Sequence, residues 1–349
     1  MKSIKIGEFI IDQNSPVFII AELSANHNGS IDTAIETVKA AKRAGANCIK
    51  LQTFTADTIT LDSKEEDFKI KQDTLWDGQY LYDLYKTTHL PWEWHKKIME
   101  VAQEEGLICF SSPFDPTSVE FLETLNVPAY KIASFEITDI PLIELVASKG
   151  KPIIISTGIA EQEDIELALD ACKRMGNSNI ALLKCTSSYP APIGEANMSM
   201  VKDLAERYDV ISGLSDHTLG STVPIVATTL GAKIIEKHFI LDRSIGGADA
   251  SFSMNEVEFS LMVKAVREAE SAIGNVDYTL TEKQRKGRVF CRSLYVLKDV
   301  KKGDKLTLEN VRSIRPGYGM HPKFLNQILG NIFSKDIKKG TPLNQEDFI

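Results

Sequence analysis

Eight short apolar runs, each followed by a segment of helical periodicity, occupy about the first 270 residues of the chain. The runs are apolar at nearly every position, which is typical of parallel strands buried on both faces. Eight strand–helix units of this length favour a closed (β/α)8 barrel over an open doubly wound sheet, and no G-x-G-x-x-G motif follows the first run. The predicted strands are residues 17–22, 48–52, 107–112, 129–134, 152–157, 180–185, 210–214 and 233–238, and the predicted helices include 31–44, 118–125, 161–175 and 255–273.

A second, smaller domain is predicted from charge and from an internal repeat. Residues 288–349 hold 12 Lys and Arg against 6 Asp and Glu, so this tail carries +6 and the rest of the chain −14, for a total of −8. Residues 298–311 (KDVKKGDKLTLENV) return as residues 335–348 (KDIKKGTPLNQEDF), which predicts a small pseudo-symmetric β-rich domain. We expect a barrel domain at 1–275, a polar linker at 276–288 and the small domain at 289–349.

The composition is that of an ordinary globular protein, with 43% hydrophobic and 25% charged residues. No apolar run reaches the roughly 18 residues of a membrane span, and no secretory signal is visible, so we expect a cytoplasmic protein without a membrane partner. The basic tail could meet an acidic partner or an anionic substrate, or it could be a nucleic-acid or carbohydrate-binding module on an inactive barrel. The net charge of −8 and the acidic residues within the tail argue against nucleic acid. Five cysteines without a C-x-x-C pair are expected to be reduced, buried thiols: Cys48, Cys109, Cys172, Cys185 and Cys291.

Polar side chains stand at nearly every carboxyl end of the predicted strands, which is where the reacting groups of a (β/α)8 barrel lie. A buried ammonium group is costly without a counter-charge, so Lys50 and Lys131 predict a cradle for a substrate that carries phosphate and carboxylate groups. Serines at neighbouring strand ends would join them: Ser112, Ser134 and Ser156. A third strand-end lysine, Lys184, could equally pair with Glu136 or Glu22. For each lysine the alternative is an ordinary ion-paired or solvent-directed side chain.

Two histidines, His217 and His238, end the last two predicted strands, which are neighbours in a closed barrel. Their imidazoles could therefore bind one divalent ion, and nearby carboxylates are available at Glu22, Asp216, Glu236 and Asp249. Two histidines completed by water and substrate oxygens suit Mn²⁺, with Mg²⁺ or Co²⁺ as alternatives, acting as a Lewis acid with open positions. A closed structural zinc site is not expected.

Several of these strings together resemble the sialic acid synthase family over essentially the whole chain. They are residues 21–29 (AELSANHNG), 49–53 (IKLQT), 111–114 (SSPF), 130–134 (YKIAS), 156–158 (STG), 213–217 (GLSDH) and 236–239 (EKHF). The tail, including Arg315-Pro316-Gly317, resembles that family's antifreeze-like (SAF) domain. Residues 75–85 (LWDGQYLYDLY) and 91–95 (PWEWH), and SANH at 24–27, resemble the pseudaminic acid synthase branch in particular.

The resemblance implies a carbon–carbon bond-forming transferase. Such an enzyme condenses phosphoenolpyruvate with an amino-sugar aldehyde and water, and releases phosphate and a nine-carbon 2-keto acid by C–O cleavage. For the pseudaminic branch the sugar is 2,4-diacetamido-2,4,6-trideoxy-L-altrose. The alternative is an N-acetylneuraminate or legionaminic acid synthase that acts on N-acetylmannosamine or its 6-deoxy diacetamido analogue. Related barrels that make a keto-sugar acid phosphate or an aromatic precursor lack the C-terminal module.

The resemblance also implies roles for individual residues. Phosphoenolpyruvate is held by Lys50, Ser112, Lys131, Ser134, Ser156, Ser187 and Ser215. Relatives often have Thr and Asn in place of Ser112 and Ser187. Glu136 is the first candidate for proton transfer and Glu22 the second, and the nearby lysines are expected to lower the pKa of such a carboxylate. The sugar meets Gln52, Tyr189, Asp249 and Arg315. In relatives the arginine crosses from the partner subunit, which implies a domain-swapped homodimer.

An aromatic insert from Trp76 to Trp94 has two interpretations. It could be a surface loop anchored by aromatic side chains. It could instead form a wall for the methyl group of a 6-deoxy sugar, where neuraminate synthases must admit a hydroxylated chain.

Overall fold

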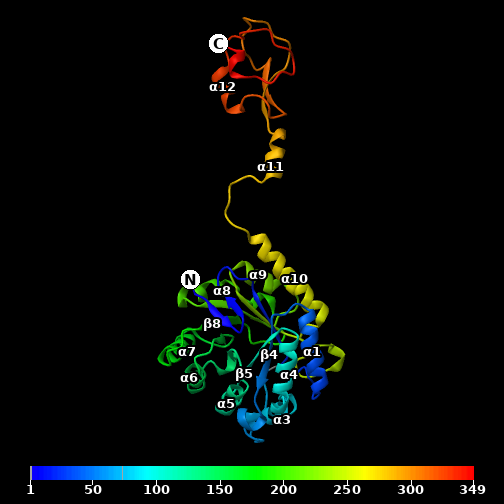
Figure 1. Ribbon diagram of the computed structural model, residues 1–349, viewed down its shortest axis with the longest axis vertical. Coiled ribbons are helices and arrows are strands. Elements are labelled where there is room, and N and C mark those ends of the chain that lie inside the picture. The colour runs from blue at the N-terminus through cyan, green and yellow to red at the C-terminus, as the bar shows by residue number, and fades with distance from the viewer. Residues whose placement is uncertain (1, 73) are drawn as a thin grey trace. The chain divides into compact units, whose positions relative to one another are not determined.

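Eight parallel strands close into a barrel in the computed structural model, which describes residues 2–72 and 74–349 (Figure 1). The strands follow one another around the barrel in chain order, and the last pairs with the first. Their bounds are β3 (Phe18–Glu22), β4 (Cys48–Thr53), β5 (Ile108–Pro113), β6 (Tyr130–Ile132), β7 (Ile153–Ser156), β8 (Ile180–Cys185), β9 (Ile211–Asp216) and β10 (Ile234–His238). The predicted (β/α)8 barrel is therefore confirmed. The predicted fourth strand is shorter than expected, because the chain turns into a 3-10 helix at Ser134–Glu136.

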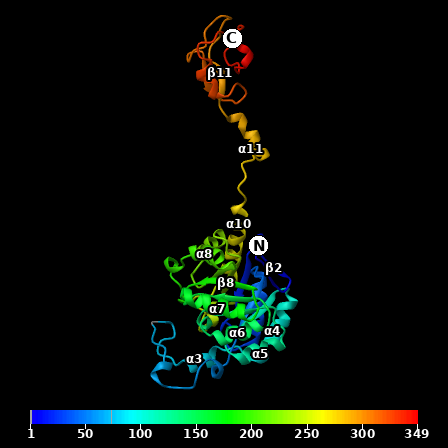
Figure 2. The same ribbon diagram turned by 90° about the vertical axis from the view of Figure 1, so that its left-hand side faces the viewer.

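Helices surround the barrel (Figure 2), and several of them start with a side-chain cap. Ser30 caps the first by accepting a hydrogen bond from the amide of Thr33, and Asn255 forms a capping box with Glu258 before the last. The helices are α1 (Ile31–Arg43), α2 (Ala56–Ile59), α3 (Leu81–Thr88), α4 (Trp92–Glu104), α5 (Pro116–Thr124), α6 (Ile140–Ser148), α7 (Gln162–Arg174), α8 (Ser199–Tyr208), α9 (Thr222–Thr229) and α10 (Glu256–Ile273).

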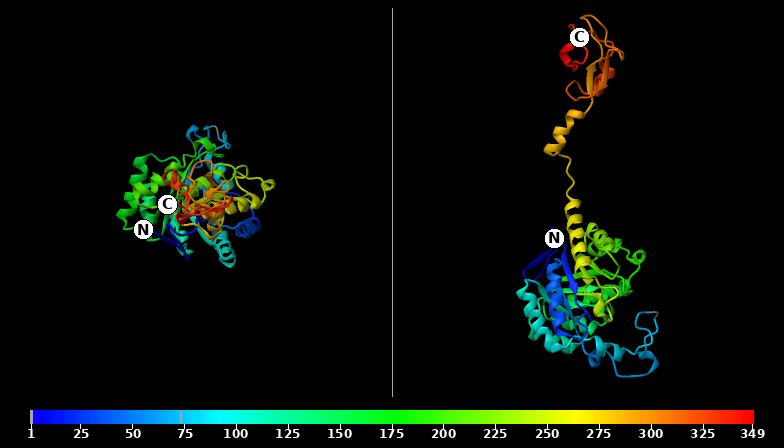
Figure 3. Two further views of the ribbon diagram at one scale, coloured as in Figure 1. Left: turned by 90° about the horizontal axis from the view of Figure 1, so that it is seen from above. Right: turned by 90° about the vertical axis from the view of Figure 1, so that its right-hand side faces the viewer.

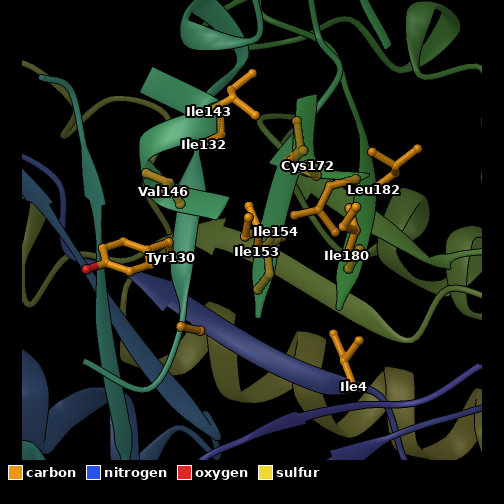
Figure 4. Packing of buried hydrophobic residues seen from close by; sticks show 14 of the residues in the cluster. Ile4, Tyr130, Ile132, Ile143, Val146, Ile153, Ile154, Cys172, Ile180 and Leu182 are labelled. Carbon is orange, nitrogen blue, oxygen red and sulfur yellow. The ribbon is translucent and has the colours of Figure 1, made fainter. Parts of the chain in front are cut away.

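A two-stranded hairpin, β1 (Ile4–Ile6) and β2 (Phe9–Ile11), precedes the barrel and was not predicted from the sequence. Its turn contains Gly7 at φ 57°, a backbone conformation that favours glycine. The hairpin buries Ile4, Ile6 and Ile11 in the same apolar cluster as Ile153 and Ile180 of the barrel (Figure 4). Each buried isoleucine contributes about 1.5–3 kcal/mol, so the hairpin adds to the core at the amino ends of the strands.

The chain divides into two compact units, Met1–Gly274 and Asn275–Ile349. The second unit holds α11 (Glu282–Gly287), β11 (Ser293–Val296), β12 (Val311–Ile314) and α12 (Leu325–Ile328) (Figure 3). Its separate apolar cluster consists of Leu294, Val296, Val300, Leu306, Val311, Ile328, Phe333, Ile337, Leu343 and Phe348.

The internal repeat appears in this unit as a reciprocal set of contacts. Val300 and Ile337, which are equivalent in the two copies, form an antiparallel bridge. Asp336 accepts hydrogen bonds from the Lys301 ammonium group at 2.7 Å and from the amide of Lys302 at 2.9 Å. In the other copy Asp299 accepts the matching bonds from the Lys338 ammonium group and the amide of Lys339, at 3.3 and 2.8 Å. The two copies therefore pair with each other around a local pseudo-twofold axis.

No helix in the described part of the chain is long and apolar enough to cross a membrane. Four of the cysteines are buried free thiols, but Cys291 is exposed, so the expectation of burial is wrong for that residue.

Candidate active site

A buried network of opposite charges lies at the carboxyl ends of four strands. The Nζ atom of Lys50, on β4, is 2.7 Å from Glu22 Oε2 on β3 and 3.3 Å from Glu236 Oε1 on β10. The Nζ atom of Lys131, on β6, is 3.9 Å from the same Glu236 oxygen and donates a hydrogen bond of 2.6 Å to Ser156 on β7. At most 6% of each charged side chain is exposed, so these groups interact with little screening by water. Glu236 therefore joins the two lysines that the sequence singled out.

Serine hydroxyls surround this network. Ser112 lies 3.4 Å from Lys50 Nζ, and Ser215 donates a hydrogen bond of 3.1 Å to Glu236. Ser134 accepts a hydrogen bond of 3.1 Å from the amide of Gly158. A Cβ atom added to Gly158 would lie 2.1 Å from the Ser187 hydroxyl and 2.7 Å from the Ser134 hydroxyl. The glycine thus leaves room for two hydroxyls to converge at one point.

The pKa values of the network follow from burial and from its paired charges. Burial by itself lowers the pKa of Lys50, but Glu22 and Glu236 outweigh it and raise that pKa above the usual range. Burial lowers the pKa of Lys131, an effect that the Glu236 charge only partly offsets. Lys131 and Lys50 together overcome burial at Glu236 and lower its pKa. Burial raises the pKa of Glu22 to about 7 against the influence of Lys50, so near neutral pH the network keeps a surplus of positive charge.

Glu136 stands apart from these ion pairs. It lies in the 3-10 helix after β6, and its Oε2 atom is buried without a hydrogen-bond partner among the described residues. Burial raises the pKa of Glu136 to about 7, and the Lys131 charge opposes that shift without reversing it. The expectation of a lowered pKa is therefore wrong for Glu136 and for Glu22, because loss of hydration outweighs the attraction of the lysines.

The two predicted metal-binding histidines are neighbours. The ring centroids of His217 and His238 are 5.2 Å apart. The Nδ1 atom of His217 makes a 3.0 Å hydrogen bond with the carbonyl oxygen of Thr186, which leaves Nε2 as a ligand atom. The Nδ1 atom of His238 is buried and has no hydrogen-bond partner among the described residues. Burial lowers the pKa of His238 and keeps its ring neutral, as a metal ligand must be.

This donor set fits a divalent ion bound by two imidazoles and completed by water or substrate oxygens. In residues 2–72 and 74–349 no three His, Cys, Asp or Glu side chains come together as a metal-binding cluster. Two of the carboxylates expected near the metal, Glu22 and Glu236, instead pair with Lys50. A third, Asp216, pairs with the buried Lys237 at 2.5 Å.

Strand β8 presents a cysteine and not a lysine to the histidines. The Sγ atom of Cys185 lies 3.8 Å from His217 Nδ1 and 3.8 Å from the Ser187 hydroxyl. Side chains alternate along a strand, so Lys184 points to the opposite face. Its Nζ atom donates to the carbonyl oxygen of Cys185 at 2.6 Å, and among the described residues it forms no ion pair with Glu136 or Glu22. Burial raises the pKa of Cys185, but the hydrogen bond and charge of His217, with smaller effects of Ser134 and Lys131, together outweigh it and lower that pKa to about 7.

Three of the residues expected to meet the sugar lie beside the buried charges and the two histidines. Gln52 donates hydrogen bonds to Glu22 at 2.9 Å and to Ser24 at 3.1 Å. Asp249 accepts a hydrogen bond from the Ser24 hydroxyl, and its Oδ2 atom lies 3.9 Å from His238 Nδ1. The ring of Tyr189 lies 4.4 Å from that of His217 and 6.4 Å from that of His238, measured between centroids.

Arg315 belongs to the second unit, where it follows β12 and is exposed. The structure places it only within that unit.

Sequence reasoning named two groups beside the histidines and lysines without the contacts that they make here. Cys185 had a usable signal in the alternation of β8, whereas Glu236 was considered only as a metal ligand. The shared inward face of Glu236 and His238, two positions apart on β10, indicated that both would line the barrel.

Comparisons with known proteins agree with this geometry. The model of the NeuB family matches residues 37–278, and that of the SAF domain matches residues 292–349. A pseudaminic acid synthase of Campylobacter jejuni is 51% identical over 99% of both chains. One of Helicobacter pylori is 48% identical over 95% of this chain and 98% of its own. An N,N'-diacetyllegionaminic acid synthase of Legionella pneumophila is 37% identical over 93% of both.

Solved structures extend the similarity to the fold. An N-acetylneuraminic acid synthetase of Leptospira borgpetersenii, in complex with citrate, superposes with a TM-score of 0.72 at 30% identity, over 82% of this chain and 95% of that one. A phospho-2-dehydro-3-deoxyheptonate aldolase of Thermotoga maritima, at 14% identity and a TM-score of 0.59 over 78% of this chain and 74% of its own, shares the fold.

Proposed function

This chain belongs to the NeuB family, and on that premise we propose that it is a pseudaminic acid synthase. The reaction joins phosphoenolpyruvate to 2,4-diacetamido-2,4,6-trideoxy-L-altrose with consumption of water, and gives pseudaminic acid and phosphate. The observation that carries the proposal is the buried pair of lysines, Lys50 and Lys131, beside the two neighbouring histidines. The identity of 48–51% to pseudaminic acid synthases over nearly the whole chain selects the sugar.

Phosphoenolpyruvate carries two anionic groups, a phosphate and a carboxylate, and the site holds two lysine ammonium groups that can bind them. Lys50 and Lys131 bind these anionic groups, and the incoming charges replace part of their pairing with Glu22 and Glu236. Hydroxyl groups complete the cradle from Ser112, Ser134, Ser156, Ser187 and Ser215. The convergence of Ser134 and Ser187 beside Gly158 supports a phosphate subsite there.

His217 and His238 hold the divalent ion, for which Mn²⁺ is the first choice and Mg²⁺ or Co²⁺ the alternatives. When bound, the ion supplies Lewis-acid polarisation of the sugar aldehyde. Burial keeps the ring of His238 neutral, and the hydrogen bond with the carbonyl oxygen of Thr186 orients the ring of His217.

The chemistry balances with one water and no other co-reactant. The vinyl C3 of phosphoenolpyruvate forms the new bond to the aldehyde carbon, whose oxygen becomes an alkoxide, and water adds at the electron-poor C2. The C2–O bond to phosphate then breaks, and the oxygen of water becomes the keto oxygen. One proton from water reaches the alkoxide and the other leaves with phosphate. Glu136 carries these protons, because its Oε2 atom is free of partners among the described residues and its pKa of about 7 suits both steps, whereas Glu22 is held by Lys50 and Gln52.

The sugar lies between Gln52, Tyr189 and Asp249. Tyr189 packs on both histidine rings, so it positions the aldehyde end close to them. In the proposed homodimer, Arg315 of each chain reaches an acetamido carbonyl at the partner's barrel, and the linker at 276–288 spans the crossing. The basic tail then meets the acidic barrel domain. Because phosphoenolpyruvate is a metabolite of the cytoplasm, the enzyme acts there.

The test is phosphate release from phosphoenolpyruvate with Mn²⁺ and one of three sugars. These are the altro diacetamido sugar, its legionaminic isomer and N-acetylmannosamine. We expect release with the altro sugar, loss of release on chelation and in His217→Ala, and none of this loss in His321→Ala, a histidine of the second unit. Water labelled with ¹⁸O should place the label in the keto acid and not in phosphate. Release with N-acetylmannosamine or the legionaminic isomer alone would favour the alternative synthases, and label in phosphate would contradict C–O cleavage.

A further inference from the structure

The segment between β4 and α4 carries aromatic side chains that the proposed reaction does not use. From here on, the insert means residues 60–88, which include α3, whereas Trp92 and Trp94 of the segment considered in the sequence belong to α4. Residue 73 is outside the described part. Within the insert, Tyr80 forms an isolated bridge with Lys69, and Lys64 pairs with Asp83 at 2.7 Å. These contacts fold the insert back on itself.

One end of the insert rests on the strand ends through aromatic rings that meet edge-on. Tyr85 of α3 meets Phe54 edge-on, with ring centroids 5.7 Å apart. Phe54 in turn meets Phe114 at 5.2 Å, and these two residues directly follow β4 and β5. Burial raises the pKa of Tyr85, and the charge of Glu136 adds to that shift, so the phenol lies within electrostatic range of the proposed proton carrier. The insert therefore borders the barrel mouth.

The other contact reaches the sugar side of the site. The ring of Trp76 lies 5.9 Å from that of Tyr189, tilted by 60°. Tyr189 is itself 4.4 Å from His217, so the three rings form a continuous row that starts at the histidines and ends at Trp76. Tyr189 thus lies between Trp76 and His217.

The indole nitrogen of Trp76 is buried and has no hydrogen-bond partner among the described residues. An indole N–H can only donate, and a buried donor without an acceptor is costly. A tryptophan that merely anchored a loop would not need to bury this polar atom beside the site. The arrangement favours an acceptor that arrives with the substrate.

We propose that Trp76 is a sugar-specificity residue whose indole N–H donates a hydrogen bond to the carbonyl oxygen of the sugar's 4-acetamido group. The proposal rests on the proposed function, which sets the aldehyde carbon at the histidines. The far half of the sugar chain, with its 4-acetamido group and terminal methyl, then lies at the outer end of the row of rings. The face of the indole packs on that apolar end. N-acetylmannosamine carries hydroxyl groups there and no acetamido carbonyl.

The experiment compares two proteins and two sugars. Trp76→Phe keeps an aromatic ring and removes the N–H donor. The sugars are the 2,4-diacetamido altro sugar and its analogue with a hydroxyl in place of the 4-acetamido group. We expect Trp76→Phe to raise the KM of the diacetamido sugar about ten-fold, the effect of one lost hydrogen bond, with kcat and the KM of phosphoenolpyruvate nearly unchanged. With the 4-hydroxy analogue, Trp76→Phe and wild type should have similar KM values.

The comparison of sugars guards against a change in folding, because misfolding would affect both sugars alike. Trp94→Phe is the matched control: its ring meets His27 edge-on and packs on the barrel core, and it should leave both KM values unchanged. An equal effect of Trp76→Phe on both sugars, or no effect on either, would overturn the role of Trp76 and leave the proposed function intact. If wild-type protein used only N-acetylmannosamine, the proposed sugar and the Trp76 hydrogen bond would both be wrong, and the wild-type measurements alone would show it.

Discussion

Glu22 and Lys50 form an ion pair of 2.7 Å inside the barrel, at the point where β3 and β4 lie side by side in register. Only 5% of the lysine side chain and 1% of the glutamate side chain are exposed. A second carboxylate, Glu236, shares the same ammonium group. One ammonium group therefore pairs with two buried carboxyl groups.

Lys50→Met should destabilise the barrel by about 3 kcal/mol, because it leaves two buried carboxylates with one cation less. Lys39→Met is the matched control, since Lys39 makes an exposed pair with Glu36 on α1 and its loss should have little effect on stability. Urea denaturation at pH 7.5 measures both. Equal effects of the two substitutions would show that the buried pair contributes no more than the exposed pair.

Gly158→Ala should raise the KM of phosphoenolpyruvate by ten-fold or more, because the new methyl group would occupy the space between the Ser134 and Ser187 hydroxyls. The KM of the sugar should change little. Gly194→Ala is the control, because a Cβ atom there has no neighbour within 4 Å. Initial rates with each substrate varied in turn give both constants, and an unchanged KM for phosphoenolpyruvate in Gly158→Ala would argue against a phosphate subsite at this point.

The stability of the protein should depend on Glu136 in a defined pH window. Its pKa rises from 4.5 to about 7 on burial, so between these values the folded chain holds a proton that the unfolded chain has released. The free energy of unfolding therefore falls as the pH rises through this window.

Glu136→Gln has no carboxyl group and removes this dependence, so its stability relative to wild type should grow from pH 5 to pH 8, by at most about 3 kcal/mol. Glu120→Gln, at an exposed position of α5, controls for the loss of a negative charge. Denaturation curves at the two pH values provide the comparison. A constant difference between Glu136→Gln and wild type would contradict a raised pKa.

His217→Ala and His238→Ala should each weaken the binding of Mn²⁺ by at least about 10–100-fold, since even the loss of a residue that orients a ligand has that effect. The electron paramagnetic resonance signal of free Mn²⁺ measures this binding without any substrate. His321→Ala should bind the ion as wild type does. Unchanged binding in either variant would remove that histidine from the proposed ligand set.

The barrel was predictable from the sequence because strands buried on both faces leave an unbroken apolar run, as in residues 17–21 (VFIIA). The end of strand β6 was harder to predict. Ala133 and Ser134 look like a continuation of the strand in the sequence, but the backbone turns into a 3-10 helix at Ser134. The β1–β2 hairpin was missed, since its three-residue strands owe their burial to the barrel beneath them and not to their own pattern.

Within the site, the sequence identified which residues end the strands but not which face each of them occupies. Lys184 and Cys185 are adjacent, so alternation puts them on opposite faces, and the register of β8 in the barrel then shows that the thiol is the one that faces His217. The pKa of Glu136 was predicted in the wrong direction, because burial depends on the turn after β6, which local sequence does not reveal. The contact of Trp76 with Tyr189 joins segments far apart in the chain, and no periodicity records such a contact.

The alternation of β8 also bears on how such a site can be altered. A single-residue insertion within that strand would exchange Cys185 for a lysine beside the histidines and would reverse every neighbouring side chain. The insert starts and ends outside the strands, so its length and composition can change without shifting any strand by one position. Diversification of the accepted sugar is therefore expected to occur in such loops, whereas the strands that hold phosphoenolpyruvate stay fixed in length.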